Sequence, residues 1–138
     1  MTVCVLLLLA CAGLGAASSA VSLVQTLPDK ASRTPAQQKI DSQLLAEVFR
    51  KQGKSLEKND RPGKASLRID ARGRALVDVR AEVSESLQQK IRDLGGAIDA
   101  TSAEFRSIVA WVPLLKLEQL AGESAVISII AKPEAVIR

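Results

Sequence analysis

The order of hydrophobic patterns between residues 75 and 132 constrains the fold of this chain more than any other feature. Residues 75–83 alternate apolar and charged side chains, which is the period of a half-buried strand. Helical spacing then follows, because Leu87, Ile91 and Leu94 recur at intervals of one helical turn. The chain therefore changes from strand to helix within a few residues.

Residues with capping propensity mark where this helix begins and ends. Ser84 can cap its N-terminus, and Gly95-Gly96 can end it with a left-handed turn. Two runs with strand propensity come next, over residues 97–101 and 105–112, and the residues between them are predicted to form a turn. The pattern predicts a strand pair directly after the helix.

A second short helix is expected between Pro113 and Gly122, because proline favours the first turn of a helix and glycine its end. Residues 126–130 are rich in β-branched side chains and predict a last, largely buried strand, closed at Lys132-Pro133. Three leucines lie on one side of the helix: Leu114, Leu117 and Leu120.

This order predicts an α+β fold, the ferredoxin-like βαββαβ sandwich, with a four-stranded antiparallel sheet and two helices on one face. The domain is expected over residues 66–133, with a tail over residues 134–138. A hairpin through Gly73 should lead from residues 67–70 into the first long strand. A domain of about 60 residues buries only about 60% of the surface of its unfolded chain, so we expect a partner to stabilise it.

An additional amphipathic helix is predicted upstream, over residues 35–52. Thr34 and Gln37 have the spacing of a capping box around Pro35, and Gly53 ends the helix. Its apolar stripe consists of Ile40, Leu44, Leu45, Val48 and Phe49. Residues 21–34 are expected to be irregular. Residues 53–65 are polar and rich in turn-forming residues, so we expect a flexible linker and a loosely tethered helix.

The N-terminus has the features of an export signal. The apolar run over residues 3–14 is shorter than the roughly 20 residues that span a bilayer, and small residues up to Ala20 permit cleavage there. Residues 1–20 are therefore interpreted as a signal peptide, although no basic residue precedes Lys30. Cys11 ends a lipobox-like sequence and is the alternative, a lipid anchor. Either interpretation predicts a secreted, periplasmic or cell-envelope protein that contacts the membrane only through this segment.

The chain contains no histidine, which excludes Ser-His-Asp and Cys-His catalysis and His-ligated metals within this polypeptide. Cys4 and Cys11 both lie in the segment expected to be removed, so no thiol nucleophile is left. No phosphate-binding glycine loop or CxxC pair occurs, so no cofactor is predicted. Nucleic-acid binding is not expected either, because residues 75–83 lack the aromatic side chains on which bases stack. We expect a protein-binding domain, not an enzyme.

The chain also resembles a known family in four segments: Ile69-Asp70-Ala71-Arg72-Gly73-Arg74-Ala75-Leu76-Val77-Asp78-Val79, Leu94-Gly95-Gly96-Ala97-Ile98, Ile108-Val109-Ala110-Trp111-Val112-Pro113 and Leu117-Glu118-Gln119-Leu120-Ala121. Together they resemble the N-terminal prodomain-like region, of the peptidase-inhibitor type, of bacterial subtilisin-like serine peptidases. The resemblance spans residues 65–135. It implies a ferredoxin-like domain whose sheet packs on two helices of a subtilisin-like serine peptidase.

The resemblance further implies that the segment after the last strand enters the active-site cleft of the peptidase as a product-like inhibitor. In this sequence that segment is Ala131, Lys132, Pro133, Glu134, Ala135, Val136, Ile137 and Arg138. The family's linker and catalytic residues would follow Arg138. Two interpretations stay open, a free-standing inhibitor or intramolecular chaperone, and a gene fragment.

Trp111 is the remaining candidate for partner binding. It alternates with Ile108, Ala110 and Val112 and so belongs to the opposite face of its strand. Tryptophan is enriched at the anchor positions of interfaces, but it could equally cover the sheet's open face or pack under the first helix. The alternative function is an envelope protein–protein interaction or dimerisation module that pairs through the open face and is lipid-anchored at Cys11.

Overall fold

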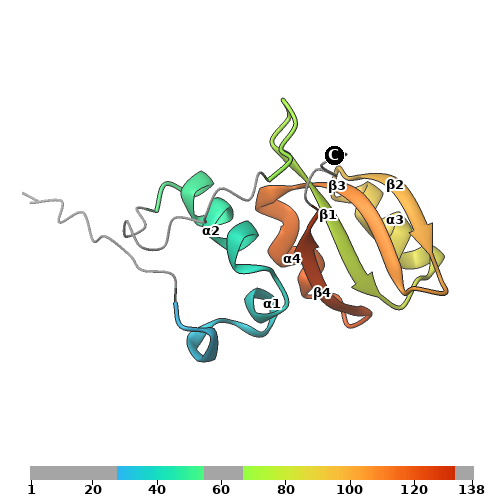
Figure 1. The fold of residues 1–138 in the computed structure, drawn as a ribbon, viewed down its shortest axis with the longest axis horizontal. Helices are drawn as coiled ribbons and strands as arrows, with labels where there is room; N and C mark the ends of the chain where they lie inside the picture. Colours follow the sequence, from blue (N-terminus) through green and yellow to red (C-terminus); the bar gives the residue numbers. More distant parts are fainter. Residues whose placement is uncertain (1–27, 55–66, 133–138) are drawn as a thin grey trace, which may run out of the picture.

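The computed structural model describes residues 28–54 and 67–132. Its centre is a four-stranded sheet in the order β2-β3-β1-β4, in which every neighbouring pair is antiparallel (Figure 1). The strands are β1 (Arg74–Ala81), β2 (Ala97–Ser102), β3 (Ser107–Pro113) and β4 (Val126–Ala131). Helices connect β1 to β2 and β3 to β4. This order confirms the predicted α+β, ferredoxin-like arrangement.

Helix α3 (Glu85–Asp93) begins and ends where its capping residues predict. The Ser84 hydroxyl accepts a hydrogen bond from the backbone N–H of Leu87 at 3.2 Å, and Gly95 has a φ of 87°. The next residue, Gly96, permits a close approach, since a Cβ atom there would lie 2.8 Å from the carbonyl oxygen of Ile91. The two glycines thus end the helix and let β2 begin directly against it.

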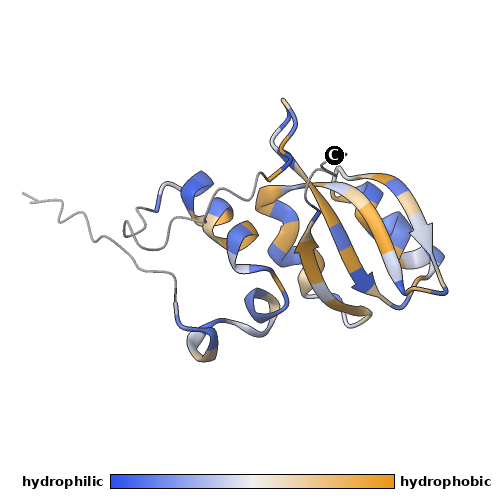
Figure 2. Cartoon of the chain, in the orientation of Figure 1, coloured by the Kyte–Doolittle hydropathy of each residue, from blue (hydrophilic) through white to orange (hydrophobic). Residues whose placement is uncertain are grey.

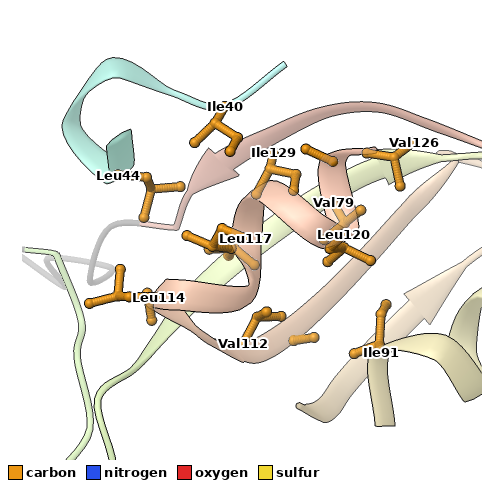
Figure 3. Close-up of a cluster of buried hydrophobic side chains, with 14 of the residues drawn as sticks. Ile40, Leu44, Val79, Ile91, Val112, Leu114, Leu117, Leu120, Val126 and Ile129 are labelled. Atoms are coloured by element: carbon orange, nitrogen blue, oxygen red, sulfur yellow. The ribbon is translucent and has the colours of Figure 1, made fainter. Parts of the chain in front are cut away.

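The second crossover is a 3-10 turn, η3 (Leu114–Lys116), followed by α4 (Leu117–Ala121). Its three predicted inward leucines are all buried, at 1%, 0% and 0% exposure along the chain. Figure 3 shows two of them, Leu117 and Leu120, beside Val79 and Ile129 of the sheet. Burying each such aliphatic side chain contributes roughly 1.5–3 kcal/mol relative to leaving it exposed, so this layer holds α4 against β1 and β4.

The N-terminal region does not form the single helix predicted over residues 35–52. It forms α1 (Pro35–Gln38), with the predicted capping box at Thr34, and α2 (Ser42–Lys51). Between them the backbone pairs with β4. The N–H of Ile129 donates to the carbonyl of Lys39 at 2.7 Å, and the N–H of Asp41 donates to the carbonyl of Ile129 at 2.9 Å. These bonds replace those of a continuous helix.

Helix α2 is an integral part of the core, so the expected loose tether was wrong. Its stripe side chains Leu44, Leu45 and Val48 are at most 1% exposed and belong to the same hydrophobic cluster as the sheet. Figure 1 shows α2 beside β4 and α4.

In the segment expected to be irregular, Lys30–Ser32 forms a short 3-10 turn, η1. Most of the predicted linker, like the signal peptide, lies outside the described residues.

Three further expectations about strands need correction. The β4 strand lies at the edge of the sheet and is not largely buried, since Ile127 and Ile130 are 59% and 43% exposed. Phe105 is 68% exposed in the turn before β3 and does not belong to the strand. The predicted hairpin is reduced to one bridge, between Ile69 and Ala75, although Gly73 has the expected positive φ of 74°.

Candidate protein-binding face

One face of the sheet has none of the described helices over it, and we call it the open face. Successive side chains of a strand point to opposite faces, so alternate residues form the open face and the residues between them form the helix-covered face. Alternation along β1 is visible as blue and orange bands in Figure 2. Strand pairing brings the apolar side chains of the open face near one another. Leu76 lies opposite Trp111, and Asp78 lies between Val109 and Ile130. These four residues form what we call the apolar centre: Leu76, Val109, Trp111 and Ile130.

The apolar centre is partly accessible. Leu76 and Val109 are 5% and 7% exposed, whereas Ile130 is 43% exposed and Trp111 is half-buried. None of the four belongs to the main hydrophobic cluster on the other face. A large aromatic side chain set among aliphatic neighbours and open to solvent on one side is the typical composition of an interface anchor.

Trp111 carries a cation on its ring. The guanidinium carbon of Arg68 lies 5.6 Å from the ring centroid, which is within the range of a cation–π interaction. The backbone places it there, since the Leu76 N–H donates to the carbonyl of Arg68 at 2.9 Å. Trp111 therefore lies on the open face and not under the first helix, as the alternation of its strand predicted.

The short hairpin that carries Arg68 depends on Asp70. One carboxylate oxygen of Asp70 accepts the backbone N–H groups of Arg72 and Arg74, each at 2.9 Å, and the other accepts the Arg74 Nε–H at 2.7 Å. The hydrogen bond from the Arg74 backbone, reinforced by the Arg74 side chain and the Arg72 N–H, lowers the pKa of Asp70 despite its partial desolvation. The ionised carboxylate thus holds the turn that returns the chain to β1.

Polar side chains also lie on the open face, with Asp78 between Val109 and Ile130 and Arg80 further along β1. Asp78 accepts a hydrogen bond from the Ser107 hydroxyl at 2.5 Å, and its other oxygen lies 3.5 Å from Arg80 Nε. Arg80 also donates to the carbonyl of Phe105 at 3.3 Å. These groups are satisfied within the domain, so the apolar side chains of the open face are the ones with most to gain from a partner.

The remaining predicted site residues lie at the end of β4 or beyond it. Ala131 is half-buried and pairs with Val77. Lys132 is exposed, and its N–H donates to the carbonyl of Leu76 at 3.1 Å. Residues 133–138 and Cys11 lie outside the described residues. The structure thus brings Lys132 next to Leu76, the cross-strand partner of Trp111, which sequence reasoning did not anticipate.

Sequence reasoning singled out Trp111 alone on this face and missed its neighbours. Alternation along the strands was a sufficient signal for Leu76 and Val109, because both have the parity opposite to the core residues beside them. Arg68 had no such signal. Its position depends on the return of a hairpin whose pairing is limited to a single bridge.

The described residues contain no group of three or more His, Cys, Asp or Glu side chains placed to hold a metal ion. Within the same part of the chain, no helix has the length and apolar character needed to cross a membrane. Comparisons of the chain with protein-family models, with curated proteins and with solved structures found no match. The open face is thus the feature from which a function can be argued.

Proposed function

We propose that this chain is an exported, non-catalytic protein-binding domain that acts as an inhibitor or folding assistant of a subtilisin-like serine peptidase. One observation carries the proposal. The described helices pack on one face of the sheet and leave an apolar centre that includes Trp111 on the other. Docking a partner's helices there would bury apolar surface that is now partly in water, at roughly 25 cal/mol per Å².

The direction in which the chain leaves the domain supports an inhibitory tail. The last paired residue of β4 is Ala131, and the next N–H, that of Lys132, bonds to Leu76 of the open face. The tail over residues 133–138 would therefore start at the docking surface. An extended peptide can add to the substrate-binding edge of a peptidase through main-chain hydrogen bonds, with alternate side chains filling pockets. Such inhibition needs no catalytic residue in this chain.

Incubating residues 21–138 with subtilisin-class peptidases tests the proposal. We expect reduced peptidase activity and faster recovery of activity when the denatured peptidase is refolded with the chain. Trp111→Ala should weaken inhibition by about tenfold or more, the cost typical of a tryptophan anchor. Leu115→Ala is the matched control, because Leu115 is 57% exposed but lies in η3 and not on a strand of the sheet. It should inhibit like the unmodified chain.

A second variant separates docking from inhibition. A chain that ends at Lys132 keeps the open face but lacks the tail, so it should still bind the peptidase while inhibiting it much less. Unchanged peptidase activity together with unchanged refolding would contradict the proposal. A tight dimer in sedimentation that ignores peptidases would instead support the envelope dimerisation module.

A further inference from the structure

Strand β4 has the composition of a strand that pairs with copies of itself. Val126–Ala131 contains four β-branched residues in the order Val-Ile-Ser-Ile-Ile-Ala, with no charge and no proline, which is typical of segments that assemble edge to edge. It lies at the edge of the sheet, next to β1 alone. Ile127 and Ile130 are 59% and 43% exposed. An edge of this kind usually needs protection in a soluble protein.

The protection comes from one short segment, Lys39–Asp41, which we call the clasp. It uses the outward N–H and C=O groups of Ile129, through bonds of 2.7 Å to the Lys39 carbonyl and 2.9 Å from the Asp41 N–H. Ile40 of the clasp is only 2% exposed and lies beside Ile129 in Figure 3. Among the described residues, Ile129 is the one β4 residue whose backbone groups bond across this edge.

The clasp is held by its flanking helices. Asp41 caps α2 by accepting the N–H of Gln43 at 2.8 Å. On the other side, Lys39 Nζ donates to the carbonyl of Glu123 at 3.2 Å and Gln37 Nε2 contacts Glu118 Oε1 at 3.4 Å. Two backbone bonds and a few side-chain contacts thus close an edge that would otherwise extend along the whole strand.

We propose that the outer edge of β4 is a self-association site for a second copy of this chain, and that the clasp keeps it closed. Twofold antiparallel pairing of β4 with β4 would face uncharged, β-branched side chains with their own copies, so no like charges would meet. The N–H and C=O groups of Ile129 would then bond the partner strand in place of the clasp. This site is the hydrogen-bonding edge of β4 and not the open face, to which β4 contributes Ile130, so the proposal does not depend on the proposed peptidase partner.

A substitution at Asp41 weakens the clasp by removing one of its two backbone bonds, without changing β4. Asp41 has a φ of −52°, which proline adopts without strain, but proline has no N–H to give to Ile129. Asp41→Ala is the matched control, because it also removes the cap of α2 yet keeps the N–H. In sedimentation, Asp41→Pro should self-associate about tenfold more tightly than Asp41→Ala, the factor that corresponds to one backbone hydrogen bond of typical strength.

A second substitution shows whether β4 is the surface used. Ile127→Lys places a charge on the exposed edge and should return the Asp41→Pro chain to the monomer. Leu115→Lys adds the same charge at a site of similar exposure, 57%, outside the edge, and should leave the association unchanged. Ile127→Lys should also leave peptidase inhibition intact, which separates this test from that of the proposed function.

Two results would overturn the proposal: a folded Asp41→Pro chain that stays monomeric, or association that persists with Ile127→Lys. If Asp41→Pro loses its circular dichroism signal, the test uses chains with an intact clasp instead. Their association is measured at high concentration and at a temperature below the unfolding transition. Slower association of Ile127→Lys than of Leu115→Lys would then support the proposal, and equal rates would overturn it.

Discussion

The two faces of the sheet are built from alternate residues of the same strands, yet they differ in what they contain. On the helix-covered face, Val77, Val79 and Ile129 are all fully buried. On the open face, Asp78 and Arg80 alternate with them, and the aliphatic side chains gather around Trp111. Because period 2 assigns neighbours to opposite faces, a single strand can serve packing on one side and recognition on the other.

This difference has an energetic consequence. Among the described residues no polar or charged residue is buried, so the helix-covered face needs no hydrogen bond to compensate desolvation. The helix-covered face stabilises the fold through the burial of aliphatic surface. The open face instead carries satisfied polar groups and a partly accessible apolar centre. An exposed side chain there, such as Ile130, should be replaceable with little loss of stability, whereas the buried Ile129 one residue away should not.

Two adjacent isoleucines give the sharpest test of the comparison and the largest expected effect. Ile129 is fully buried, and Ile130, on the other face of β4, is 43% exposed. Ile129→Ala should lower the free energy of unfolding by about 2–5 kcal/mol, and Ile130→Ala by less than about 1 kcal/mol. Urea unfolding followed by circular dichroism measures both. Equal costs would show that the open face is as much a part of the core as the other.

The order of the elements could be predicted because its signals are local. The alternation along β1, the stripe of α3 and the caps at Ser84 and Gly95 all lie within the elements that they define. Each signal depends on residues a few positions apart, where propensity and side-chain direction are decisive. The ferredoxin-like topology then follows from the order, since few connections of these elements are physically favoured.

The errors arose where residues distant in sequence determine the structure. The helix expected over residues 35–52 breaks because Ile40 pairs with Ile129, and nothing in the local sequence indicates that partner. The burial of β4 was overestimated for a related reason, since a β-branched run indicates a strand but not its place in the sheet. Whether such a strand is central or at the edge depends on the pairing of the whole sheet.

The candidate site was predictable to the same limited extent. Alternation assigned Trp111 to the correct face, because that depends only on its neighbours along β3. The cation above its ring was not predictable, because Arg68 reaches it through a backbone bond to Leu76. A pattern within one strand therefore identifies the face, and tertiary pairing supplies the side chains that complete it.

Replacing the cation above Trp111 should give a smaller effect than the isoleucine pair. Arg68→Gln removes the charge, and a partly exposed cation–π contact contributes about 0.5–1 kcal/mol. Trp111 is the only tryptophan, so its fluorescence reports on the open face directly. For Arg68→Gln we expect a shifted emission spectrum and a loss of stability equal to the contribution of the cation–π contact. Arg72→Gln, in the same hairpin, should change neither. Identical spectra for the two variants would mean that Arg68 does not cover the ring in solution.

The smallest expected effect is a pH dependence of the free energy of unfolding, which originates in Asp70 of the hairpin that carries Arg68. The pKa of Asp70 is lower in the folded chain than in the unfolded one, so ionised Asp70 stabilises the folded state above the unfolded pKa of about 4. This stabilisation should be lost as the pH falls through the folded pKa.

Asp70→Asn serves as the reference for this loss, because it cannot ionise. The difference in free energy of unfolding between the unmodified chain and Asp70→Asn should shrink on acidification below about pH 4. Trp111 emission should shift over the same range, because the hairpin that Asp70 holds also carries Arg68. A difference that stays constant from pH 7 to pH 2 would show that Asp70 does not hold the hairpin. The support of the open face would then have to come from the backbone bond between Leu76 and Arg68 alone.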